Sequence, residues 1–108
     1  MARANNPYRC AIYWTVIVTD SFPEVTVCGL TGLIRFNRTA SMIWLLSDGH
    51  HSEEQIFQVL KERFPDVSAG RLREEVGRFL TQAESRGLLV RHWDPLQPYR
   101  VMYEGLIG

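Results

Sequence analysis

The stretch FNRTASMIWLLSDG, residues 36–49, decides the fold, because the hydrophobic pattern changes its period within it. Six of the nine residues at 39–47 are apolar, and a helix so rich in apolar side chains must be mostly buried. Asn37 or Thr39 can cap the free N–H groups at its start, and Gly49 can end it in the left-handed conformation. We therefore predict a short buried helix that begins directly after an extended segment.

Three segments ahead of this helix have the composition of strands. Residues 9–19 are rich in Ile, Val, Tyr, Trp and Thr, which suit a pleated surface. A turn at 20–24 separates them from two shorter strands, 25–28 and 33–36. The glycines between those two strands permit the positive φ angles of a hairpin loop. We predict three antiparallel strands, with residues 33–36 on the last of them.

Two further helices follow the buried one. Ser52 and Gln55 have the spacing of a capping box, so a second helix begins at Ser52, and Pro65 marks its end. A third helix covers about residues 68–86, where apolar residues recur at three and four positions. Strands grouped ahead of helices indicate an α+β fold. We predict a small winged-helix-like domain, a three-stranded antiparallel sheet followed by three helices, with Trp44 beneath the sheet.

The length of 108 residues indicates one domain, which we place at residues 9–92. Residues 1–8 are expected to be a flexible N-terminus. The extension at 93–108 is rich in aromatic and aliphatic residues, so it is expected to pack on the domain, on a second copy of the chain or on a partner. There is no apolar signal-peptide core, and no run is long enough to cross a bilayer. We expect a cytoplasmic protein without membrane contact. Its two cysteines, Cys10 and Cys28, are expected to be free thiols, with a disulfide between them as the alternative.

Several kinds of chemistry find no support in the sequence. The formal net charge is zero, so nucleic acid is not expected as a partner. No Cys or carboxylate completes a metal site with His50 and His51, and neither a metal nor another cofactor is expected. Ser47, Asp48 and His50 are residue types of a catalytic triad, but the strained turn of a nucleophile is missing, and the end of the helix explains them better. We do not expect an enzyme.

Three consecutive motifs resemble the PqqD family, which belongs to a wider group of recognition elements for ribosomally made precursor peptides. These motifs are TGLIRFNRTASMIWLLSDG, SEEQIFQVLKERFP and VGRFLTQAESRGLLV, at residues 31–49, 52–65 and 76–90. The likeness covers about residues 25–90. It departs from the family pattern at Phe36, where leucine is usual, and at Ala40, where glycine is usual.

The resemblance implies a non-catalytic adaptor. Such a protein binds the leader of a precursor peptide and presents it to a modifying enzyme, such as a radical SAM protein, a protease or a cyclase. The leader would join the sheet as an extra strand beside residues 33–36, in a groove closed by the third helix. An unpaired strand edge can supply the main-chain hydrogen bonds, and side-chain pockets then give selectivity.

The candidate peptide-binding residues lie on the last strand and on the third helix. They are Leu33, Ile34, Arg35 and Phe36 on the strand, and Arg71, Leu72, Glu75, Val76, Arg78, Phe79 and Gln82 on the helix. The helical spacing of Phe79 favours a place in the core, and Arg71, Glu75 and Arg78 offer charges for the leader.

Two alternatives remain open at this point. One is a winged-helix DNA-binding regulator, although the third helix carries four arginines against three glutamates, a local balance of +1. The other is that residues 95–108 fill the strand edge, within the chain or through a homodimer.

Overall fold

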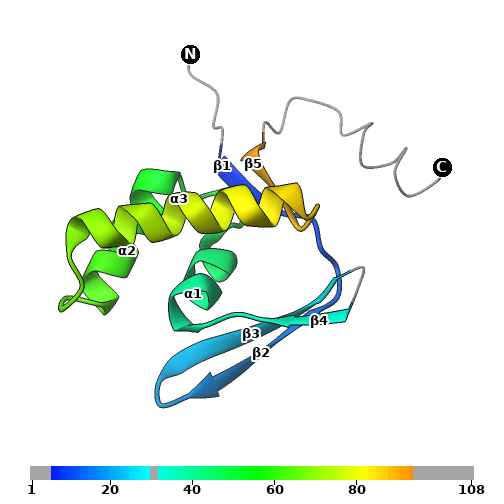
Figure 1. Ribbon diagram of the computed structural model, residues 1–108, viewed down its shortest axis with the longest axis horizontal. Coiled ribbons are helices and arrows are strands. Elements are labelled where there is room, and N and C mark those ends of the chain that lie inside the picture. The colour runs from blue at the N-terminus through cyan, green and yellow to red at the C-terminus, as the bar shows by residue number, and fades with distance from the viewer. Residues whose placement is uncertain (1–5, 30–31, 94–108) are drawn as a thin grey trace.

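The computed structural model describes residues 6–29 and 32–93 (Figure 1). Its elements, in chain order, are β1 (Asn6–Arg9), β2 (Trp14–Thr19), β3 (Phe22–Gly29), β4 (Gly32–Arg35), α1 (Arg38–Leu46), α2 (Glu53–Arg63), α3 (Ala69–Ser85) and β5 (Leu89–Trp93). The strands β2, β3 and β4 form an antiparallel sheet in that order, and the three helices lie on one side of it. The predicted α+β fold is confirmed. No helix within the described ranges is long and apolar enough to cross a membrane.

The prediction of a single strand over residues 9–19 is wrong. The chain leaves β1 at Arg9 and enters β2 at Trp14, and these strands belong to different sheets. Between them, the N–H groups of Cys10 and Ala11 both donate to the carbonyl of Leu88, at 3.0 and 3.1 Å. This pair of hydrogen bonds holds the crossing segment against the chain that leaves α3.

The two-stranded sheet β1–β5 was not predicted from the sequence. Asn6 pairs with Trp93 and Tyr8 with Val90, so the folded unit begins within the segment expected to be flexible. Tyr8 and Trp93 also stack, with ring centroids 4.5 Å apart. The remainder of the predicted extension, residues 94–108, lies outside the described residues.

The junction between β4 and α1 is held by two polar side chains. Asn37 caps α1 as predicted, because its Oδ1 accepts the N–H of Ala40 at 2.8 Å. The hydroxyl of the buried Ser41 accepts the N–H of Val25 at 2.9 Å and donates to the carbonyl of Phe36 at 3.4 Å. Ser41 therefore ties the first turn of the helix to the end of the β3–β4 ladder.

The end of α1 lies two residues earlier than the predicted glycine stop. The helix ends with Ser47 as its C-cap, and Gly49, at φ 84°, belongs to the turn that follows. A side chain at Gly49 would collide with Trp93 and Tyr8, since an added Cβ would lie 2.8 Å from a Trp93 ring carbon. Its backbone N–H donates to the carbonyl of Pro7 at 2.8 Å, which anchors this turn to β1.

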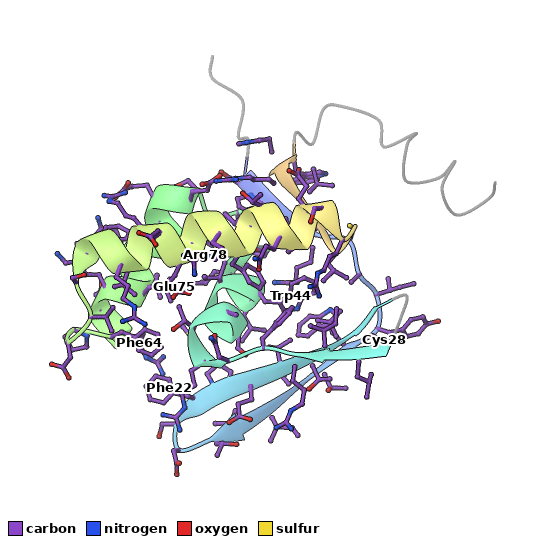
Figure 2. All side chains as sticks on the ribbon, in the orientation of Figure 1. Phe22, Cys28, Trp44, Phe64, Glu75 and Arg78 are labelled. Carbon is purple, nitrogen blue, oxygen red and sulfur yellow. The ribbon has the colours of Figure 1, made fainter. Side chains whose placement is uncertain are left out.

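Trp44 is the centre of the core and is fully buried between α1 and the sheet (Figure 2). Its ring meets Trp14 of β2 edge to face, with centroids 6.0 Å apart, and Phe36 at 5.6 Å. The other buried apolar residues are Val25, Val27, Met42, Ile43, Ile56, Phe57, Leu60, Leu72, Val76, Leu80, Ala83, Leu88 and Leu89. The sequence placed Trp44 correctly.

The remaining helices follow their local signals. Ser52 and Gln55 form the predicted capping box, and α2 ends at Arg63, two residues before Pro65. The side chain of Ser68 accepts the N–H of Arg71 and caps α3. Cys10 and Cys28 are both free.

Arg91 on β5 clamps the strand to α2 and α3. Its guanidinium donates to both carboxylate oxygens of Glu53, at 2.9 and 3.1 Å, and to the hydroxyl of Thr81 at 2.7 Å. The hydrogen bonds from Arg91 hold the pKa of Glu53 below its usual value of 4.5, against the opposing effect of partial burial.

A pH dependence of stability follows from this clamp. A carboxylate whose pKa is lower in the folded state stabilises the protein above its unfolded pKa, and this contribution is lost as the pH falls through the folded pKa. We expect the melting temperature to fall more steeply below about pH 4.5 in the wild type than in Glu53→Gln. Thermal denaturation followed by circular dichroism at a series of pH values measures this. Glu62→Gln, on the same helix, is the matched control, and equal profiles for wild type and Glu53→Gln would contradict the prediction.

Candidate functional site

The free edge of β4 is the first part of the site. Phe36 donates its N–H to the carbonyl of Val25 at 2.9 Å, and the same register pairs Ile34 with Val27. In an antiparallel ladder, hydrogen-bonded and non-hydrogen-bonded pairs alternate. The N–H and C=O groups of Leu33 and Arg35 therefore point away from β3, toward the open edge of the sheet.

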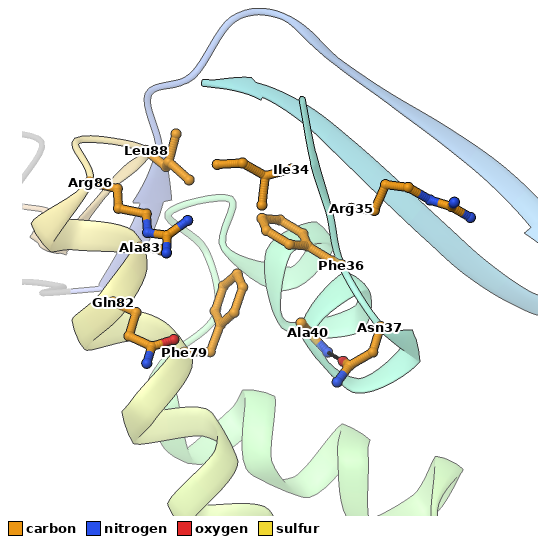
Figure 3. Close-up of a pocket in the computed structure, with 10 residues that line it drawn as sticks. All are labelled: Ile34, Arg35, Phe36, Asn37, Ala40, Phe79, Gln82, Ala83, Arg86 and Leu88. Atoms are coloured by element: carbon orange, nitrogen blue, oxygen red, sulfur yellow. Dashed lines mark hydrogen bonds between the residues drawn. The ribbon is translucent and has the colours of Figure 1, made fainter. Parts of the chain in front are cut away.

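A groove runs between this edge and α3, and Figure 3 shows one part of it. That part is a pocket of about 220 Å³, lined by Ile34, Arg35, Phe36, Asn37, Ala40, Phe79, Gln82, Ala83, Arg86 and Leu88. A second pocket of about 290 Å³ adjoins it and shares Asn37, Ala40, Phe79 and Gln82, with Ile43, Glu75 and Arg78 as further lining residues. We call the two pockets together the β4–α3 groove.

Aromatic packing fixes the floor of the groove. Phe36, the residue directly after β4, and Phe79 from α3 meet edge to face, with centroids 5.1 Å apart at 88°. Behind them, Phe36 rests on the buried ring of Trp44. The two walls are thus connected through one set of rings to the centre of the core. Ala40, a small side chain in the first turn of α1, lines both pockets and leaves the groove open.

Most of the predicted site residues meet at this groove. Ile34 and Arg35 line it from β4, which ends one residue earlier than predicted, and Phe36 lines it from the position directly after the strand. Glu75, Arg78, Phe79 and Gln82 line it from the helix. Phe79, whose spacing favoured the core, is half-buried and forms part of the groove wall. Leu33 is 75% exposed, and its side chain lies on the opposite face of the sheet, so it offers the groove only its backbone.

Three predicted residues do not reach the groove. Leu72 and Val76 are only 1% and 3% exposed, and they pack in the core with Leu80. Arg71 is exposed on α3 but lines neither pocket. These three lie outside the helical stripe that meets β4.

Sequence reasoning also missed several groove residues. They are Asn37, Ala40, Ile43, Ala83, Arg86 and Leu88. A signal for Arg86 was present, because Glu75, Phe79, Gln82 and Arg86 follow at intervals of four, three and four, the spacing of one helix face.

The composition of the groove suits binding of an extended chain. Its lining residues include no histidine, cysteine, serine, threonine or aspartate among those described. The triad residue types identified in the sequence lie elsewhere and serve local structure. Ser47 donates its hydroxyl to the carbonyl of Ile43 at 2.7 Å, and Asp48 accepts from the backbone of His50 at 2.8 Å and contacts the ring of His51 at 2.9 Å.

Comparison with known proteins is consistent with this geometry. The family model of coenzyme PQQ synthesis protein D (PqqD) matches residues 25–89, which is more than half of the chain and contains both walls of the groove. A protein named PqqA binding protein, from Acinetobacter baylyi (strain ATCC 33305 / BD413 / ADP1), is 40% identical over 55 residues, which cover 51% of this chain and 54% of that relative. The chain thus matches about half the length of this curated relative. No solved structure matches it significantly. On the extent of the family match, the chain belongs to the PqqD family.

Proposed function

We propose that the protein binds a ribosomally made precursor peptide by strand addition at β4 and presents it to a modifying enzyme, without itself catalysing a reaction. The observation that carries this proposal is the open edge of β4 facing a walled groove. A radical SAM protein, a protease or a cyclase would be the enzyme that receives the peptide. The free thiols Cys10 and Cys28 are compatible with action in a reducing cytoplasm.

An added strand would use both the backbone and the side chains of the site. The outward N–H and C=O groups of Leu33 and Arg35 would pair with the peptide backbone, at a net gain of about 0.5–1.5 kcal/mol for each hydrogen bond. Peptide residues opposite Ile34 and Phe36 would turn their side chains into the groove, because alternate residues of a strand share a face. Backbone pairing would supply affinity, and the groove would supply selectivity.

The other edge of the sheet, β2, is less suited to this task. Its residues Val16, Ile17 and Val18 are 45%, 67% and 70% exposed, so none of the residues that the structure describes forms a wall beside them. An edge without a wall can pair with a backbone but cannot select its side chains. We therefore place the peptide at β4.

DNA binding gains no support from the charges on α3. Arg73 forms an ion pair with Glu54 at 2.9 Å, and Arg78 forms one with Glu74 at 3.1 Å. Phosphate contacts need cations that are free to pair, and these two ion pairs leave only Arg71 and Arg86 for that purpose, fewer than a recognition helix usually offers.

The ligand that we propose for testing is a PqqA-type peptide, since the Acinetobacter relative is named as a PqqA binding protein. Synthetic PqqA of that organism is titrated into the 15N-labelled protein, and amide hydrogen exchange is measured with and without it. We expect saturable binding and new protection at the N–H groups of Leu33 and Arg35. The N–H of Phe36, already bonded to Val25, is the internal control and stays protected in both states.

Two results would contradict the proposal. One is the absence of saturable binding to the full chain. The other is protection that appears at Trp14, Val16 and Val18, whose backbone groups face the open edge of β2, while Leu33 and Arg35 stay unprotected.

A further inference from the structure

We infer that the β4–α3 groove selects peptides in which an acidic residue lies two positions from an apolar residue that packs in the groove. We infer further that Arg86 binds the carboxylate of the acidic residue. This inference rests on the proposed function and adds the chemistry of the ligand to it. It follows from the charge of Arg86, from the absence of a partner for its guanidinium among the described residues and from its position in the pocket of Figure 3.

The pocket in Figure 3 combines an apolar wall with the cationic side chain of Arg86. Six of its ten lining residues are hydrophobic, namely Ile34, Phe36, Ala40, Phe79, Ala83 and Leu88. The side chain of Arg86 points toward the pocket, whereas that of Arg35 points away from it (Figure 3). None of its lining residues is acidic. The charge presented to a bound side chain is therefore positive.

Arg86 differs from its neighbouring cations because its charge is not neutralised. Arg73 and Arg78 of α3 pair with glutamates. Glu84, the carboxylate nearest to Arg86 in sequence, accepts the backbone N–H of Arg91 at 3.0 Å. Within residues 6–29 and 32–93, the guanidinium of Arg86 makes no hydrogen bond or ion pair. A carboxylate from a ligand would find all of its donors available.

Strand geometry places the acidic residue relative to the anchor. A peptide residue opposite Phe36 would lie over the paired rings of Phe36 and Phe79, so an apolar side chain fits there. The residue opposite Ile34 faces the same groove two positions along the peptide. It would rest its methylene groups near Ile34 and Leu88 and extend its carboxylate to Arg86. The resulting pattern is an apolar residue, any residue and then an acidic residue, in the chain direction that the pairing adopts.

A displayed library of random peptides of about twelve residues tests this inference without a known ligand. It is selected on four full-length proteins: wild type, Arg86→Gln, Arg86→Glu and the control Arg71→Glu. Arg71 is a matched arginine of α3 that lines neither pocket. Thermal unfolding checks that each variant is folded, and Arg86→Gln remains informative if the glutamate variant is unstable.

We expect the wild type and Arg71→Glu to enrich peptides with an acidic residue two positions from an apolar one. Arg86→Gln is expected to keep the apolar anchor and lose the acidic preference, and Arg86→Glu is expected to prefer lysine or arginine at that position. For a single enriched peptide, Arg86→Gln should bind about tenfold more weakly, and exchanging its acidic residue for the amide should have little further effect.

Failure of the inference can be told apart from failure of the proposed function. Suppose that the peptides selected on the wild-type protein protect Leu33 and Arg35 from exchange but show no preference for an acidic residue. This result would overturn the inference and leave the proposed function intact. An acidic preference that persists in both Arg86 variants would also overturn it. If no peptide is enriched, or if the enriched peptides leave the β4 amides unprotected, the proposed function fails and the inference fails with it.

Discussion

Replacing Trp44 by alanine is expected to lower the free energy of unfolding by about 3–5 kcal/mol. The ring is fully buried and touches Trp14 on one side and Phe36 on the other, so its loss would leave a cavity between helix and sheet. A domain of this size has a total stability of about 5–15 kcal/mol. The variant would therefore lose a large part of its stability, as measured by urea denaturation.

The substitution Trp44→Phe distinguishes the contribution of ring packing to the free energy of unfolding from the cost of burying the indole N–H. The indole Nε1 is buried and has no hydrogen-bond partner among the described residues. A buried donor without a partner is costly, so phenylalanine would lose packing area but also remove that cost. We expect Trp44→Phe to be destabilised by about 1–2 kcal/mol, clearly less than the alanine variant. Equal losses for both substitutions would show that the ring is not packed as described.

Replacing Arg35 by proline is expected to weaken binding of the precursor peptide by tenfold or more, about 1.4 kcal/mol, while the fold survives. Its N–H points away from β3, so proline removes a donor that the peptide would use and none that the sheet uses. The ring would also occupy space beside the incoming strand. Ile34, the preceding residue, is already extended, as a residue before proline prefers to be.

Arg35→Ala is the matched control for this substitution. It removes the same charge, which is exposed and lies 4.0 Å from Glu24, but it keeps the N–H. An exposed ion pair contributes about 0–1 kcal/mol, so we expect the alanine variant to bind within a few-fold of wild type. Isothermal titration with the precursor peptide measures both affinities. A proline variant that is folded and binds as tightly as the alanine variant would show that the peptide does not pair with β4.

The helices could be predicted closely because their signals are local. Asn37, Ser52 and Ser68 each accept a backbone N–H three residues ahead, an interaction contained within one turn of chain. The β1–β5 pairing joins Asn6 to Trp93, and a local sequence pattern cannot predict a pairing partner so distant in the sequence. The same distance explains why residues 9–19 appeared as one strand. Their composition suits a strand throughout. The segment is divided only because its first part pairs with β5 and its last part pairs with β3.

Local sequence patterns were enough to predict the α+β class, the three helices and their N-terminal caps, and the likeness to the PqqD family indicated the strand and the helix that form the groove. The tertiary structure alone decided which side of α3 faces β4. Val76 is buried and Phe79 lines the groove, although they are only about 60° apart around a helix that turns about 100° per residue. An amphipathic pattern locates the apolar stripe of a helix. Which residues at the edge of that stripe are buried depends on how the helix is rotated about its axis against its neighbours. That rotation is set by the packing of Trp44 in α1, Phe79 in α3 and Phe36 in the short segment between β4 and α1.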